Sequence, residues 1–95
     1  MAGMWIAQVN VTDQESYGRY VAKAGEVLKA HGATFLSRGG RYKQMEGPEH
    51  ARIVVATFPT FQDAIDCYNS EAYQEIIGDA IAGSERSIVI VETDD

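Results

Sequence analysis

The sequence has a single cysteine, few basic residues and no long apolar run, and each shortage excludes something. Cys67 alone cannot form an internal disulfide, which agrees with a reducing compartment. Eight Lys and Arg against fourteen Asp and Glu give a net charge of -6, which disfavours nucleic acid and anionic membranes as partners. No apolar run reaches about 18 residues, so we expect no membrane-spanning helix. Residues 1–6 lack the basic start of a signal peptide, so we expect a cytoplasmic protein.

The usual marks of a metal centre or a catalytic site are also missing. We expect His31 at a helix end and His50 in a loop, and neither has a Ser or Cys partner at a diagnostic position. Cys67 has no second cysteine or basic neighbour in sequence, so we expect it to be buried and inert. No His, Cys, Asp and Glu cluster has metal-ligand spacing, and no haem, flavin or phosphate-loop motif is present. We therefore expect no metal and no cofactor.

The pattern of apolar residues predicts alternating strands and helices. A capping box at 12–15 predicts the start of the first helix, and Gly32 predicts its end. Thr60 and Ser70 are predicted caps of two further helical segments, the second of which ends at Gly83. The predicted strands are 4–11, 33–38, 52–58 and 87–93, with an extended path resuming over 41–46 after Gly39 and Gly40.

The order strand, helix, strand, strand, helix, strand is that of the ferredoxin-like, split βαβ pattern. We therefore expect residues 1–95 to form one α+β domain of the βαββαβ type. Its sheet is expected to be four-stranded and antiparallel, with the helices on one face.

The strands also predict a partner for the uncovered face of this sheet. The runs 53–56 and 88–91 contain no polar residue, and we place both in central strands that are apolar on both faces. No sequence remains for a third layer, so a second copy of the chain is the simplest cover. We expect a homodimer through the open sheet face, the alternative being a monomer with a mildly apolar surface.

Several motifs are distinctive. They are Arg-Gly-Gly at 38–40, Glu-Gly at 46–47, Phe-Pro-Thr-Phe at 58–61, Cys-Tyr-Asn-Ser-Glu-Ala-Tyr-Gln at 67–74, and Arg86 before the run 88–92. Together they resemble a known bacterial family, the one called domain of unknown function 1330. The resemblance implies the dimeric α+β-barrel superfamily, a ferredoxin-like fold and no established activity. Relatives in that superfamily include cofactor-independent monooxygenases, isomerases, haem enzymes and stress-responsive proteins. Cys67 departs from the family, whose members often carry an aromatic residue there.

Arg38, Tyr68 and Arg86 are the candidate ligand-binding residues. Arg38 ends the second predicted strand and Arg86 precedes the last, so the two guanidiniums could converge near the second helix and bind a carboxylate or phosphate. Tyr68 could donate a hydrogen bond from the end of that helix, or be a core residue with its hydroxyl in water. Alternatively, each arginine pairs with an acid such as Glu46 or Glu71, or lies in water.

Two classes of function stay open at this point. One is a pocket between sheet and helices for a small anionic or aromatic acid, with monooxygenase-like or isomerase-like chemistry as an enzymatic variant. The other is a non-catalytic structural or stress-responsive dimer. The first predicts arginines that line a partly apolar cavity without acidic partners. The second predicts arginines that are satisfied by protein groups.

Overall fold

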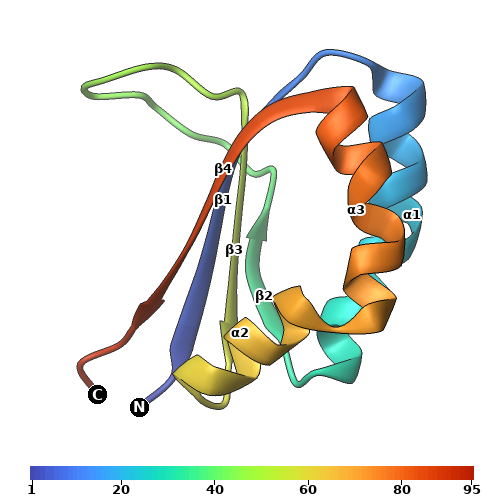
Figure 1. Cartoon of the computed structure of the whole chain (residues 1–95). Coiled ribbons are helices and arrows are strands. Elements are labelled where there is room, and N and C mark those ends of the chain that lie inside the picture. Colours follow the sequence, from blue (N-terminus) through green and yellow to red (C-terminus); the bar gives the residue numbers. More distant parts are fainter.

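The computed structural model describes all 95 residues and has two layers, with three helices over one face of a four-stranded antiparallel sheet (Figure 1). The elements are β1 (Gly3–Val11), α1 (Gln14–Ala30), β2 (Thr34–Arg38), β3 (Arg52–Phe58), α2 (Phe61–Asn69), α3 (Glu71–Gly83) and β4 (Ser84–Glu92). The strand order is β2-β3-β1-β4. This arrangement confirms the ferredoxin-like βαββαβ fold. None of the three helices is long and apolar enough to cross a membrane.

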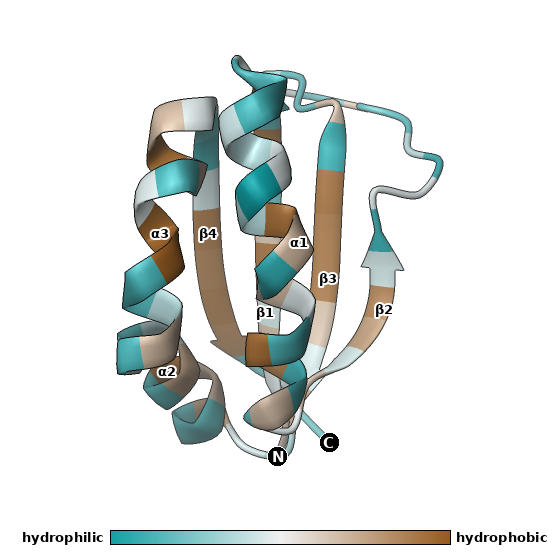
Figure 2. Ribbon diagram, turned by 90° about the vertical axis from the view of Figure 1, so that its right-hand side faces the viewer, coloured by the Kyte–Doolittle hydropathy of each residue, from teal (hydrophilic) through white to brown (hydrophobic).

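The core lies between the helices and the inner face of the sheet. On β1, the side chains of Trp5, Ala7 and Val9 alternate inward and are buried. Ala56 and Phe58 of β3 extend this face. Seen from the helix side, the strands behind the helices are mostly hydrophobic, and hydrophilic residues recur along the helices (Figure 2).

The first helix starts at a different cap from the predicted one. Asp13 accepts hydrogen bonds from the backbone N–H groups of Glu15 and Ser16 at 3.0 and 3.3 Å, so the capping box on Thr12 is wrong. A carboxylate at this position also interacts favourably with the helix dipole. Gly32 follows the helix with φ +94°, which confirms the predicted end.

Two predicted strand boundaries are wrong. β4 begins at Ser84 rather than at residue 87, because its pairing with β1 continues to Val11. Residues 41–46 form no strand and belong to a loop between β2 and β3. Asn10 holds the end of that loop, since its side chain donates to the Glu49 carbonyl and accepts from the backbone N–H of Ala51.

We had predicted that the last strand lies in the centre of the sheet. This is wrong, because β4 lies at the edge. Its inward residues, Ile88 and Ile90, pack on the core, whereas Val89 and Val91 face away and are 53% and 47% exposed. An unbroken apolar run therefore does not mark a central strand here. The outer sheet face carries the apolar residues Met4, Ile6, Leu36, Ile53, Val55, Val89 and Val91.

Candidate anion-binding site

A cavity lies between α1 and the sheet, where both layers carry small residues. Ala7 lies on its floor, and Ala24 and Gly25 of α1 lie on its roof. The cavity is narrow, with a volume of about 30 Å³, which is room for a few water-sized groups. Its apolar lining consists mainly of Trp5, Val21, Leu28, Phe35 and Val54.

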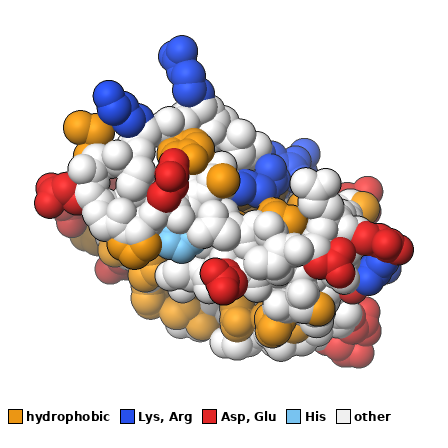
Figure 3. All heavy atoms as spheres, turned by 90° about the horizontal axis from the view of Figure 1, so that it is seen from above, with side chains coloured by type: hydrophobic (Ala, Val, Ile, Leu, Met, Phe, Trp, Pro, Cys, Tyr) orange, Lys and Arg blue, Asp and Glu red, His pale blue; other side chains and the backbone are white.

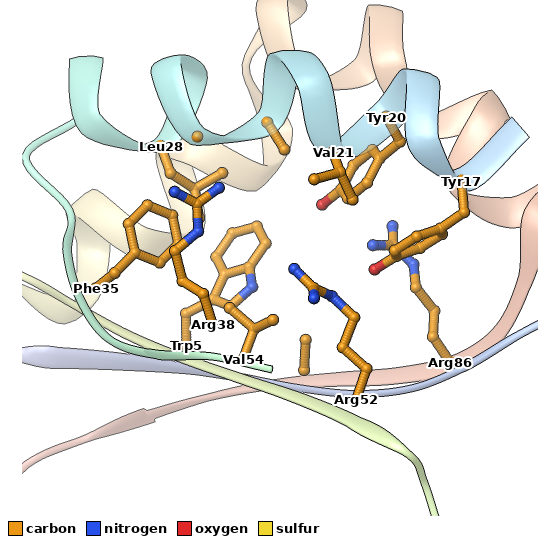
Figure 4. Close-up of a pocket in the computed structure, with 13 residues that line it drawn as sticks. Trp5, Tyr17, Tyr20, Val21, Leu28, Phe35, Arg38, Arg52, Val54 and Arg86 are labelled. Atoms are coloured by element: carbon orange, nitrogen blue, oxygen red, sulfur yellow. The ribbon is translucent and has the colours of Figure 1, made fainter. Parts of the chain in front are cut away.

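Three arginines line this cavity, and each comes from a different strand. Arg38 is in β2, Arg52 in β3 and Arg86 in β4, and their side chains extend into the space below α1 (Figure 4). The ion pairs of the protein both involve Arg19, which joins Glu15 and Asp79. None of the three cavity arginines forms an ion pair.

The strand register explains why two of the arginines face the same space. Arg52 and Arg86 are both paired with Val9, one from each side of β1. Side chains of directly paired residues on neighbouring strands point to the same face of a sheet, so both arginines point toward the core, as Val9 does. Their Cα atoms are two strand spacings apart, or roughly 10 Å.

Arg86 is fixed by two tyrosines at one end of the cavity. Its Nη2 donates to the Tyr73 hydroxyl at 3.2 Å, and that hydroxyl lies 2.6 Å from the hydroxyl of Tyr20. Its guanidinium also lies 5.0 Å from the centre of the Tyr20 ring. Burial opposes the charge, but the two tyrosines outweigh burial and raise the pKa of Arg86 above its usual value. The Arg86 guanidinium is therefore fixed in position and permanently charged.

Arg38 lies at the mouth, above Phe35 and against the backbone of α1. Its guanidinium carbon is 4.3 Å from the centre of the Phe35 ring. An irregularity of β2 between Phe35 and Ser37 brings both side chains to the inner face, although they are an odd number of residues apart. A Cβ at Gly25 would come within 3.0 Å of the Arg38 Nη2. Gly25 therefore gives this guanidinium its place beside the helix.

Arg52 lies between the other two arginines in the sheet, beside the Tyr17 hydroxyl. Its Nε is buried and has no hydrogen-bond partner within the protein. Gly39, with φ +74°, covers its outer side, where a Cβ would lie only 2.6 Å from the Arg52 Nη1. Gly39 thus follows the end of β2 and leaves room for a guanidinium.

The remaining polar groups of the cavity are aromatic. The Tyr17 hydroxyl points into the cavity beside Arg52 (Figure 4). Burial and neighbouring Tyr20 raise the pKa of Tyr17, so its hydroxyl stays protonated as a donor. The indole N–H of Trp5 faces the side of Arg52 (Figure 4). No Asp, Glu or His lines the cavity, so its polar groups are chiefly donors.

The predicted site residues are only partly brought together. Arg38 and Arg86 line one cavity, below α1 rather than near the second helix as expected. Neither pairs with Glu46 or Glu71. Tyr68 lies elsewhere, in a larger and more open groove of about 370 Å³ that shares only Arg86 with the cavity. The other residues of this groove are Ile65, Ile81, Ile88 and Ile90.

Sequence reasoning missed Arg52, Tyr17 and Tyr20. One signal was present for Arg52, because it alternates in phase with the buried Ala56 and Phe58 of the same strand. The two tyrosines were assigned to the apolar stripe of α1, and they are indeed buried there. No pattern shows that their hydroxyl ends meet arginines from distant strands.

Charge is unevenly distributed on this acidic molecule. Seen from above, one group of basic side chains lies beside apolar ones right of the middle, other basic side chains project at the edges, and acidic side chains lie at both ends and within the face (Figure 3). No three His, Cys, Asp or Glu side chains gather closely enough to hold a metal ion.

Comparisons with solved structures identify the same fold in several proteins. A protein of unknown function from Rhodopseudomonas palustris has a TM-score of 0.79 and 14% identity, over 99% of this chain and 83% of that one. SnoaB, a cofactor-independent oxygenase from Streptomyces nogalater, has a TM-score of 0.71 and 6% identity, over 99% and 94%. A dimeric ferredoxin-like protein of unknown function from Bacteroides fragilis has a TM-score of 0.56 and 11% identity, over 97% and 96%.

Sequence comparison places the chain more narrowly. No curated protein matches it significantly. A family model described as "Domain of unknown function (DUF1330)" matches residues 2–94, nearly the whole chain. This agrees with the motifs at 38–40 and 67–74, and the chain belongs to the DUF1330 family.

Proposed function

We propose that the protein binds a small anion with an apolar body in the cavity below α1. The observation that carries the proposal is the set of three arginines, Arg38, Arg52 and Arg86, in one cavity without an ion pair. Partly buried cations are costly unless they are paired. A carboxylate or phosphate of a ligand supplies the missing charge through forked hydrogen bonds.

The apolar lining selects the rest of the ligand. Trp5 and Phe35 present aromatic surfaces, and Leu28 and Val54 close the space around them. A planar or aromatic acid is favoured, because a flat body presents the smallest cross-section to a narrow cavity. Catalysis is not part of the proposal, because the lining offers no carboxylate or imidazole as a general base.

We further propose that two copies pair through the outer sheet face, in the cytoplasm. That face carries seven apolar side chains, and contiguous apolar surface of this kind is typical of interfaces. The Bacteroides fragilis neighbour, which is dimeric, supports this choice of partner. The single Cys67 thiol fits a reducing compartment.

A thermal-shift screen with benzoate, phenylphosphate and inorganic phosphate tests the binding proposal. Saturation at about 100 times the dissociation constant stabilises the protein by roughly 2.7 kcal/mol. The shift should be lost in Arg52→Gln and kept in the matched control Arg19→Gln, whose side chain pairs with Asp79 outside the cavity. Equal shifts in the two variants, or no shift with any anion, would contradict the proposal.

A further inference from the structure

We infer that the ligand of this cavity is a dianion, either a dicarboxylate or a phosphate monoester, carried on a small apolar body. The inference rests on the proposed function and adds the number of charges. It follows from how the three guanidiniums are spaced and held, and from the absence of any acid among the lining residues.

Arg52 and Arg86 arise from well-separated points of the sheet. They flank Val9 from opposite sides of β1, with Cα atoms roughly 10 Å apart. Arg86 is held by the Tyr73 hydroxyl and cannot simply turn toward Arg52. A single carboxylate that takes forked hydrogen bonds from one of them therefore leaves the other poorly paired.

The cavity carries positive charges that no acidic residue of its lining balances. Arg86 stays charged between Tyr20 and Tyr73, and Arg52 has a buried Nε without a partner. Arg38 adds a third positive charge at the mouth. In a partly buried space, like charges repel and each is stabilised by an opposite charge more strongly than in water. One negative charge leaves a net positive cavity, whereas two negative charges neutralise the two inner arginines.

The cavity also has neutral hydrogen-bond donors beside its arginines. The Tyr17 hydroxyl and the Trp5 N–H both lie on the side of Arg52 (Figure 4). A phosphate has three terminal oxygens and two carboxylates have four, so either can accept from these donors as well as from the guanidiniums. A monocarboxylate has two oxygens and satisfies fewer of them.

Calorimetric titration of the intact protein with four ligands tests the inference. They are benzoate, isophthalate, terephthalate and phenylphosphate, measured at one low ionic strength and pH 7.5. We expect at least one dianion to bind about tenfold or more tightly than benzoate, because an added close ion pair contributes over 1 kcal/mol in a partly buried site. Phenylphosphate should weaken as the pH falls through the second phosphate pKa, at about 6.

Two variants locate the second charge. Arg86→Gln should reduce the advantage of the dianion over benzoate severalfold. Arg38→Gln removes the third positive charge at the exposed mouth and should also reduce this advantage, though by less. It is expected to fold even if loss of the Arg86 contact with Tyr73 destabilises the first variant. Binding by phenylphosphate alone would identify the ester as the dianion, and binding by a dicarboxylate alone would identify the diacid.

The outcomes separate the two claims. Benzoate binding as tightly as every dianion would overturn the inference and leave the anion site standing. An undiminished advantage in both variants would also overturn it. No binding by any of the four ligands would overturn the inference and the proposed function together.

Discussion

Single residues decide where the cavity arginines lie, and two of these residues are glycines. Gly25 leaves room for Arg38 in the middle of a helix, where glycine is otherwise unfavourable. Gly39 leaves room for Arg52 in the same way, and its positive φ angle would by itself favour glycine at this position. The chain thus gives up some helix stability at Gly25 for the position of a side chain.

Gly25→Ala should therefore weaken ligand binding without weakening the fold. Alanine stabilises a helix interior by up to about 1 kcal/mol, but its Cβ would displace the Arg38 guanidinium. We expect unchanged or slightly higher stability in urea and severalfold weaker binding of phenylphosphate.

Gly78→Ala is the matched control for that substitution. A Cβ at Gly78 of α3 would meet nothing within 4 Å. It should raise the stability by a similar amount and leave binding unchanged. Equal affinities in the two variants would contradict the role assigned to Gly25.

Cys67 should be unreactive in the folded protein. Burial raises the pKa of its thiol from 9.0 to about 11, so the thiolate fraction at pH 8 falls roughly 100-fold. Because the folded pKa is raised, the associated stability is complete below pH 9 and is lost as the pH rises toward 11.

Iodoacetamide labelling at pH 8, in the native and urea-unfolded protein, checks this prediction. A Cys67→Ser, Glu75→Cys double variant is the control, because residue 75 is exposed on α3, away from the proposed interface, and should react readily. Equal rates for Cys67 in the two states would be inconsistent with a buried, neutral thiol.

Elements were easier to predict from the sequence than the site. The helix ends at Gly32, Thr60 and Ser70 were predictable because local groups form the caps, and the structure confirms all three. Thr12 and the start of β4 were predicted wrongly, because a neighbouring carboxylate and cross-strand pairing decided them. The meeting of Arg52 and Arg86 depends on register between distant strands, which no local pattern encodes.

Ser70→Ala tests how α2 and α3 are joined. The Ser70 hydroxyl donates to the Cys67 carbonyl at 2.7 Å and accepts from the Tyr73 N–H at 3.2 Å. Loss of this cap should lower the free energy of unfolding by about 1 kcal/mol, measured by urea denaturation. The exposed Thr12→Ala, just before α1, is the control. A midpoint no lower than that of the control would show that the cap contributes nothing.

At the scale of the whole molecule, the outer sheet face should hold two copies together. Val89 is 53% exposed in the single subunit, so Val89→Lys should leave the subunit folded but bury a charge in the proposed interface. We expect this variant to sediment as a monomer at concentrations where the parent protein is a dimer.

Ile81→Lys controls for the change of charge and size in that experiment. Ile81 is 64% exposed on α3, on the helix side of the molecule. The Ile81→Lys variant should sediment with the same mass as the parent protein. A dimer that survives Val89→Lys and dissociates with Ile81→Lys would place the interface on the helices instead.

The most direct test of the central claim is to observe the arginine Nε–H groups by NMR during a titration with phenylphosphate. The buried, unpartnered Nε of Arg52 should gain an acceptor and shift strongly, together with those of Arg38 and Arg86, along one saturable curve. The signals of Arg19 and Arg41, which do not line the cavity, should stay in place. Shifts confined to Arg19 and Arg41, or small unsaturated shifts of all five, would contradict an anion site below α1.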